Sequence, residues 1–81
     1  MSKQISVRYF AVYRDQVGLS EEKVETAAET AQALFQELQT RHPALEHFQA
    51  AKVAINDELS QWTDPVSDGD DVLLFPPVAG G

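Results

Sequence analysis

Apolar and polar residues alternate through residues 4–12, the first patterned segment of the chain. Side chains two positions apart share a face of a β-strand, so this alternation predicts a strand with two distinct faces. One face would carry Ile5, Val7, Tyr9 and Ala11, and the other would carry Ser6, Arg8, Phe10 and Val12. Apolar residues on both faces are typical of a strand that is covered on both sides.

Residues 21–27 alternate weakly around Val24 and predict a second strand. The residues between the two strands, 13–20, include Gly18 and Ser20 and indicate a turn. The two strands are therefore expected to pair as a hairpin.

An apolar stripe with the spacing i, i+3, i+4, i+7 predicts one main helix. Its members are Ala31, Leu34, Phe35 and Leu38. Thr30 fits an N-cap, although residues 26–29 also fit a capping box, which leaves the start open by one turn. Pro43 predicts that the helix ends at Arg41 or His42, because the residue before a proline avoids the helical conformation. Residues 44–50 could add a second, short helical turn.

The last third of the chain predicts three more strands, separated by turn signals. The strands are residues 52–56, 59–62 and 72–75, and the turn signals are residues 56–58, 64–65 and 67–70. Pro76 and Pro77 end the last strand, because neither can donate a hydrogen bond to a β-ladder.

The order strand, strand, helix, strand, strand, strand predicts an α+β domain in which the helix covers one face of a mixed sheet of about five strands. The first and last strands are the most apolar, so we expect them to be central neighbours. Residues 1–75 would form the domain, and residues 76–81 would form an extended C-terminal tail.

The composition limits the classes of function. A chain of 81 residues, 43% of them hydrophobic, forms one small globular domain. Thirteen acidic and six basic side chains give a net charge of -7, which argues against non-specific nucleic-acid or anionic-membrane binding and suits a basic partner. The absence of cysteine excludes disulfides, thiolate metal sites and thiol nucleophiles. No signal-peptide or transmembrane pattern is evident, so the expected compartment is the cytoplasm.

No set of residues in the chain predicts an active site of its own. His42 and His47 are the only histidines, and five-residue spacing without further ligands favours two solvated side chains over a metal site. Residues 68–71 have neither the spacing nor the terminal glutamate of a calcium loop. The serines lie outside a G-x-S-x-G context, and no glycine-rich phosphate loop is present.

The chain finishes in an uncharged segment, residues 72–81, whose last two residues are Gly80 and Gly81. Glycine has no Cβ and can thread a narrow channel, while Pro76 and Pro77 hold the base of the segment in an extended geometry. A stiff base and a slender tip describe an arm that delivers its terminal carboxylate to another enzyme. The alternative is a frayed end that happens to finish in glycine.

Together, the elements and the tail resemble the ubiquitin-like β-grasp family, and within it the small sulfur-carrier subunits of molybdopterin synthase. The most specific segment is residues 67–81, with an acidic D-G-D turn, an F-P-P-V strand end and a terminal G-G. The other matching residues are Phe10, Ala11, Arg14, Asp15, Gly18 and residues 53–56. Ala79 departs from the threonine or serine common in the family, which should not matter because the backbone threads the channel.

The resemblance implies that Gly81 is adenylated with ATP, converted to a thiocarboxylate, and donates sulfur to cyclic pyranopterin monophosphate to form the molybdopterin dithiolene. Gly81 would be the covalent carrier, and Gly80 would give it clearance. The implied partners are a ubiquitin-activating-like adenylyltransferase and the large subunit of molybdopterin synthase, in a heterotetramer of two small and two large subunits. The catalytic lysines would belong to the large subunit, and no stably bound cofactor or metal is implied, because ATP is consumed by the activating enzyme.

The resemblance also implies that one sheet face docks both partners. If Val72 and Leu74 face the helix, Leu73 and Phe75 face away from it. Exposed apolar residues on so small a domain usually mark an interface, although Phe10 and Phe75 could instead belong to the core. The residues assigned to partner binding are Phe10, Arg14, Leu59, Phe75, Pro76, Pro77 and Val78. The acidic residues 64–71 either steer the protein to a basic partner or form a solvated turn.

Three other functions stay open at this point. The chain could be a sulfur carrier of the thiamine pathway, which also ends in Gly-Gly, or a ubiquitin-like modifier that conjugates to lysines. It could also be a plain binding module with an inert tail. The length, the F-P-P-V element and the helix favour the molybdopterin interpretation.

Overall fold

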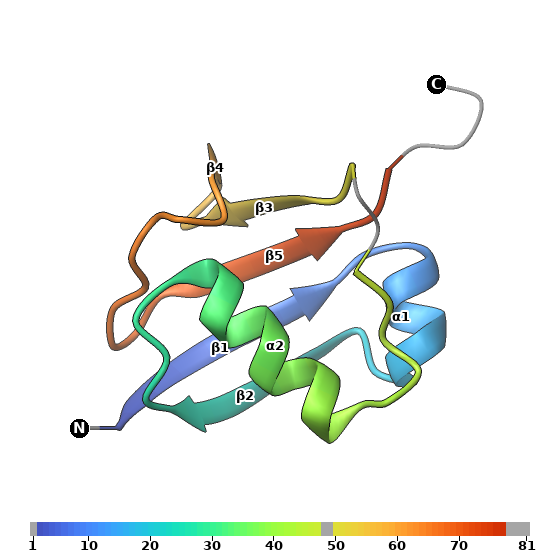
Figure 1. Ribbon diagram of the computed structural model, residues 1–81, viewed down its shortest axis with the longest axis horizontal. Helices are drawn as coiled ribbons and strands as arrows, with labels where there is room; N and C mark the ends of the chain where they lie inside the picture. The colour runs from blue at the N-terminus through green and yellow to red at the C-terminus, as the bar shows by residue number, and fades with distance from the viewer. Residues whose placement is uncertain (1, 48–49, 78–81) are drawn as a thin grey trace.

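In the part of the chain that the structure describes, five strands form one sheet, and one long helix crosses one of its faces (Figure 1). The computed structural model describes residues 2–47 and 50–77. The strands are β1 (Lys3–Tyr9), β2 (Glu21–Thr26), β3 (Lys52–Ile55), β4 (Glu58–Ser60) and β5 (Asp71–Phe75), and the helices are α1 (Val12–Val17) and α2 (Ala31–Arg41). Neither of these helices is long and apolar enough to cross a membrane.

The strand order is β2-β1-β5-β3-β4, with β1 and β5 parallel and the other neighbours antiparallel. The first and last strands of the chain are therefore neighbours inside the sheet, as predicted. This mixed sheet with α2 on one face confirms the predicted α+β class and the β-grasp fold.

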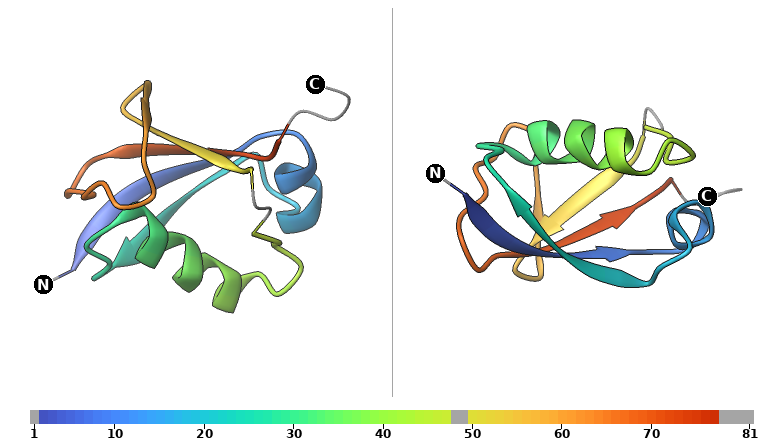
Figure 2. Two further views of the ribbon diagram at one scale, coloured as in Figure 1. Left: turned by 45° about the horizontal axis from the view of Figure 1, so that its top comes forward. Right: turned by 90° about the horizontal axis from the view of Figure 1, so that it is seen from below.

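Strand alternation separates the two faces of the sheet as the sequence predicts. The side chains that face α2 are almost completely buried: Ile5, Val7 and Tyr9 on β1, Val53 on β3, and Val72 and Leu74 on β5. Figure 2 shows α2 lying across this face, while the opposite face is open in the part of the chain that the structure describes. The prediction that β1 is covered on both sides is therefore wrong for this chain.

The predicted stripe and N-cap of α2 are confirmed. Ala31, Leu34, Phe35 and Leu38 are buried, and the backbone N–H of Ala33 donates to Oγ1 of Thr30 over 3.1 Å. The alternative capping box is not formed, because Oγ1 of Thr26 accepts from the backbone of Ala28 and bonds to Glu37 instead.

The first correction concerns residues 13–20, where the structure has the short helix α1 in place of a simple turn. Tyr13 is fully buried and Val17 packs against the core, and residues four apart lie on the same face of a helix. Gly18 ends the helix in the left-handed conformation, and its N–H donates to the Arg14 carbonyl over 2.8 Å. The glycine was evident in the sequence, but its role as a helix cap was missed.

Other predicted bounds also differ from the structure by one to three residues. Strand β1 stops at Tyr9 because the chain turns sharply at Ala11. Strand β4 stops at Ser60, where the N–H of Gln61 donates to the Asp64 carboxylate and leaves the ladder. The short helical turn predicted for residues 44–50 does not form in residues 44–47, and residues 48–49 lie outside the described residues. The Leu45 side chain is buried, which holds this segment against the core.

Two non-glycine residues with positive φ form the turn between β3 and β4. Asn56 has φ 54° and Asp57 has φ 67°, which are the signs that a two-residue type I′ turn requires. Ile55 and Glu58 pair on either side of the turn. The same Asn56 ties the hairpin to β5, because its Oδ1 accepts from the N–H of Asp71 over 2.9 Å.

Ala11 has φ 54° and ψ -126°, and the N–H of Tyr13 donates to the Phe10 carbonyl over 3.1 Å. These are the features of a type II′ turn, whose first central position favours glycine. An alanine there carries backbone strain.

We therefore expect Ala11→Gly to raise the free energy of unfolding by about 1 kcal/mol, measured by urea denaturation. Gly18→Ala is the control with the opposite expected effect. Gly18 has φ 85°, and a Cβ added there would meet no neighbouring atom, so only backbone strain would change. That variant should lose about 1 kcal/mol. A stability loss on Ala11→Gly would contradict the strained turn.

Candidate functional site

The open sheet face is the candidate site, and strand registers place its residues in rows. In the middle row, Arg8 lies beside Leu73, Leu73 opposite Ala54, and Ala54 opposite Leu59. Glu21 completes this row on β2, opposite Arg8. Apolar side chains thus run from the centre of the open face to its β4 edge.

A second row lies at the end of the sheet where β5 finishes. Phe75 pairs with Lys52, and the N–H of Phe10 donates to the Leu74 carbonyl over 3.1 Å, which continues the parallel ladder beside Phe75. The N–H of Tyr9 donates to the Ser20 carbonyl over 2.9 Å, so the continued register sets Leu19 opposite Phe10. This row therefore reads Leu19, Phe10, Phe75 and Lys52 across the sheet.

The apolar residues of these rows are unusually exposed. Phe10 is 60% exposed, Leu59 72% and Leu19 44%, whereas Leu73 and Phe75 are half-buried. A core role for Phe10 is thereby excluded, and Phe75 lies between core and surface. Leu19 was missed because the sequence placed it in a turn, and only the strand register of the structure brings it opposite Phe10. Exposed apolar residues on one face are the usual mark of a protein interface.

Arg8 is held in the open face by two aspartates. Its Nη2 lies 3.1 Å from Oδ2 of Asp71 and 3.2 Å from Oδ1 of Asp57, and its Nε donates to Asp71. The charge of Asp71 raises the pKa of Arg8 above its ordinary value. The guanidinium is thus positioned before any partner arrives.

The acidic residues 64–71 have structural partners. Asp68 accepts from the N–H of Gln4 over 2.7 Å, and Asp70 accepts from the N–H of Ser67 over 2.7 Å and from the Asn56 side chain over 3.0 Å. These contacts stabilise the turn that precedes β5. The turn lies at the opposite end of β5 from the tail (Figure 1), so these carboxylates do not border the tail.

The base of the tail is only partly accessible. Pro76 is buried and Pro77 is exposed. Arg14 is exposed on α1, at the same end of the sheet (Figure 1). Val78, Gly80 and Gly81, to which the sequence assigned partner and carrier roles, lie outside the described residues.

The prediction of two solvated histidines is wrong for His42. Its Nε2 lies 2.7 Å from Oε2 of Glu22, and the same oxygen accepts from the Tyr9 hydroxyl over 2.6 Å. His42 follows Arg41 at the C-terminal end of α2, so this cluster ties the end of the helix to the sheet. His47 is exposed, and its ring centroid lies 5.1 Å from that of Trp62.

The Tyr9–Glu22–His42 cluster alters two ionisation equilibria. Burial opposes ionisation of Glu22, but hydrogen bonds to Tyr9 and His42 and the charges of His42 and Arg41 outweigh it, and the pKa of Glu22 is below its ordinary value. Burial raises the pKa of Tyr9 well above its ordinary value, and the hydrogen bond to Glu22 and its charge add to this.

A lowered folded-state pKa means that the Glu22 carboxylate stabilises the fold above its unfolded-state pKa and that this stabilisation is lost as the pH falls through the folded-state value. Glu22→Gln should lose about 1 kcal/mol at neutral pH and show a flatter loss of stability on acidification. Unfolding curves between neutral pH and mild acid test this. Glu25→Gln, at an exposed position on the same strand, should keep the wild-type profile; identical profiles for all three proteins would contradict the role of Glu22.

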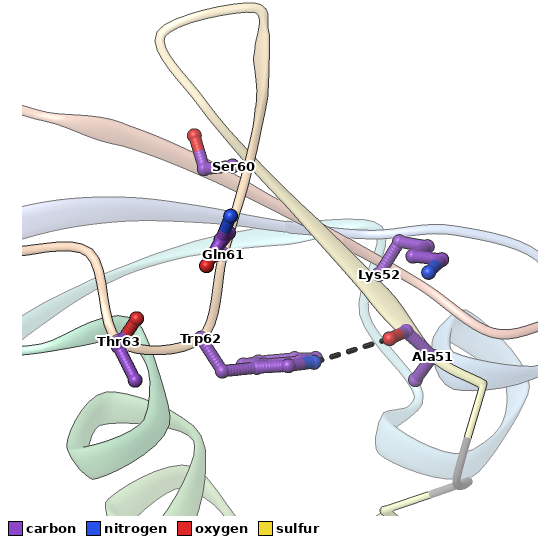
Figure 3. A pocket seen from close by; sticks show the side chains of 6 residues that line it. All are labelled: Ala51, Lys52, Ser60, Gln61, Trp62 and Thr63. Carbon is purple, nitrogen blue, oxygen red and sulfur yellow. Dashed lines mark hydrogen bonds between the residues drawn. The ribbon is translucent and has the colours of Figure 1, made fainter.

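The pocket in Figure 3 is an open depression of about 380 Å³ beside the β4 edge, lined by Ala51, Lys52, Ser60, Gln61, Trp62 and Thr63. The indole N–H of Trp62 donates to the Ala51 carbonyl over 3.1 Å. Of the residues assigned from the sequence that the structure describes, none lines this pocket. Within residues 2–47 and 50–77, no group of three or more acidic or histidine side chains could hold a metal ion.

A β-grasp domain with an exposed apolar sheet face beside the exit of its C-terminal tail defines a protein of the ubiquitin-like class. A model of the ThiS family matches residues 7–81. The chain belongs to the ThiS family.

The relatives agree with this assignment. The chain is 36% identical over 81 residues to the molybdopterin synthase sulfur carrier subunit of Escherichia coli, with 95% of this chain and 99% of the relative covered. A Pyrococcus furiosus protein described as molybdopterin converting factor subunit 1 superposes with a TM-score of 0.81 at 30% identity, covering 94% of this chain and 99% of the other.

A third similar structure comes from a complex of two proteins. It belongs to the complex of subunits 1 and 2 of molybdopterin-converting factor from Helicobacter pylori, with a TM-score of 0.60, 28% identity, and coverage of 96% of this chain and 99% of the other. A relative of this chain is thus seen with a partner subunit.

Proposed function

We propose that this chain is the sulfur carrier subunit of molybdopterin synthase. The observation that carries the proposal is the similarity to sulfur carrier subunits over nearly the whole chain, with a family match that extends through Gly81. The exposed apolar face beside the tail supports it, because a carrier must dock while its last residue reaches into another protein.

In this proposal the carboxylate of Gly81 attacks the α-phosphate of ATP on an activating enzyme, and pyrophosphate leaves. A carboxylate is a poor electrophile, and the acyl-adenylate supplies AMP as a leaving group when a sulfur donor attacks the acyl carbon. The product is a thiocarboxylate. The absence of cysteine in the chain fits this chemistry, because the sulfur then has to be carried on the main chain.

The loaded tail then enters the large subunit, where its sulfur passes to cyclic pyranopterin monophosphate. A dithiolene contains two sulfurs, so two loaded carriers are needed, which fits an assembly of two small and two large subunits. Gly80 gives the reacting end clearance because it has no side chain. ATP acts only at the activating enzyme, and this chain holds no cofactor between reactions.

The docking surface in this proposal is the open sheet face. Phe10, Leu59 and Phe75 supply apolar contact, Pro76, Pro77 and Val78 guide the tail, and Arg14 adds an ion pair at the rim. Its exposure and place on α1 suit a rim contact.

The direct test is the intact mass of the protein after incubation with the activating enzyme, ATP and a sulfur donor. We expect one oxygen to be exchanged for sulfur, and fragmentation should place the exchange at Gly81. Deletion of Gly81 should abolish both the exchange and sulfur transfer, while folding and large-subunit binding persist.

An unchanged mass, under conditions that load a known carrier, would sink the proposal. Isopeptide-linked adducts in cells in place of a thiocarboxylate would identify a modifier instead. Transfer of the loaded sulfur into a thiazole precursor, but not into the pyranopterin, would identify a carrier of the thiamine pathway.

Phe10→Ala should weaken binding to the large subunit by about 1–3 kcal/mol, as truncation of a central interface residue does, and isothermal titration would measure it. Because Phe10 is exposed, the free energy of unfolding of the Phe10→Ala variant should differ little from that of the wild type. Phe75→Ala should lose affinity as well as stability, since this side chain is half-buried. Loss of stability without loss of affinity would make Phe75 a core residue only.

A further inference from the structure

The row of residues at the tail end of the sheet has two ends without an assigned role. Leu19 continues the row beyond Phe10 toward β2, and Lys52 follows Phe75 toward β4. Leu19 is one of the large hydrophobic side chains left exposed in the described residues, and extending the β1–β2 ladder one residue beyond the Tyr9–Ser20 hydrogen bond sets it opposite Phe10. The apolar row therefore reaches across β1 to the other edge of the sheet.

Lys52 is an exposed cation beside this apolar row. Its backbone pairs with Phe75, so the two side chains share the open face. Figure 3 shows the Lys52 side chain and the Trp62 ring on opposite sides of β3. Among the described residues Lys52 has no ion-pair partner, whereas Lys3 donates to the carbonyls of Ala28 and Val66 and Arg8 is held by two aspartates.

A partner that covers Phe75 also comes close to the Lys52 ammonium group. Burying a lysine without a partner is strongly unfavourable, so the covering surface either leaves Lys52 in water or supplies an acceptor. A carboxylate is the acceptor that matches its charge. The chain as a whole has a charge of -7 and repels an acidic group at long range, so such a pair would act locally and fix orientation more than it would attract.

We propose that the large subunit of the synthase covers the row from Leu19 to Lys52, with a carboxylate opposite Lys52 and an apolar side chain against Leu19. This inference rests on the proposed function. The inference adds a fixed orientation, which the apolar face alone does not supply. An ion pair at Lys52 and an apolar contact at Leu19, at opposite ends of the row, would prevent the domain from rotating on its partner. The complex of the Helicobacter pylori relative supports a partner protein as the occupant, and the net charge of -7 disfavours a second copy of this chain.

The test is the dissociation constant for the purified large subunit, measured at low and at physiological salt. Lys52→Glu should weaken binding about tenfold at low salt, and the difference from wild type should shrink as salt rises. Lys23→Glu is the matched control, because Lys23 is also exposed and its strand partner Ser6 places it on the same face, away from the row. It carries the same change of charge and should alter the constant less than twofold.

The apolar end of the row has its own pair of variants. Leu19→Ala should weaken binding about fivefold, whereas Val12→Ala, which removes exposed apolar surface from α1 outside the row, should change it less than twofold. Thermal unfolding of each variant, together with its intact mass, would show that the domain folds and that the tail is complete.

Equal losses for Lys52→Glu and Lys23→Glu would overturn the local pair, because only overall charge would then matter. Wild-type binding by both Lys52→Glu and Leu19→Ala would overturn the inference while leaving the carrier function in place. If the wild-type protein were not loaded with sulfur, the proposed carrier function itself would be contradicted. A salt-sensitive dimer of the free chain, lost in Lys52→Glu, would replace the large subunit with a second copy as the occupant.

Discussion

The parallel pairing of β1 with β5 is the constraint on which the rest of the structure depends. It sets the first and last strands side by side in the middle of the sheet, with Val7 beside Val72 and Tyr9 beside Leu74, all of them buried. Parallel neighbours cannot be joined by a tight turn, so α2 and the β3–β4 hairpin lie between them in the chain. Because the two strands run in the same direction, the chain leaves β5 at the end where Phe10 leaves β1.

The same strands build the core and the open sheet face. A strand directs successive side chains to opposite sides, so Leu74 holds the sheet to α2 while Phe75 and Leu73 border the open face. A small domain has little surface to spare for a separate binding site. Using the second face of the central strands keeps exposed apolar residues at the end of the sheet where the chain leaves β5.

Polar contacts hold the two ends of this arrangement in place. Asn56 links the β3–β4 turn to the start of β5, and Arg8 links Asp71 to Asp57 across three strands. At the other edge, Glu22 joins Tyr9 to His42 and so fixes the C-terminal end of α2 to the sheet. Many of the acidic groups therefore stabilise turns and strand ends, and the uncharged tail emerges at the far end of β5.

The sequence by itself determined the type and approximate position of the main strands and of the long helix, through the spacing of their apolar residues. The alternation in residues 4–12, the stripe from Ala31 to Leu38 and the apolar run before Pro76 were enough to place β1, α2 and β5, because these patterns reflect burial of one face. The uncharged C-terminal segment and its two terminal glycines were also evident from the sequence. Sequence could not decide α1, because its single turn and a half is held by burial of Tyr13 and by the left-handed cap at Gly18.

Only the tertiary structure decided which residues share the open sheet face. Lys52 joins Phe75 through a strand pair, and Leu19 and Phe10 join the row where hydrogen bonds extend the ladders of β1. A register is set by contacts between segments far apart in the chain. The partners of His42 and Asp70 were hidden for the same reason. Local patterns record what each segment buries, while the neighbours of a side chain depend on how the whole sheet is assembled.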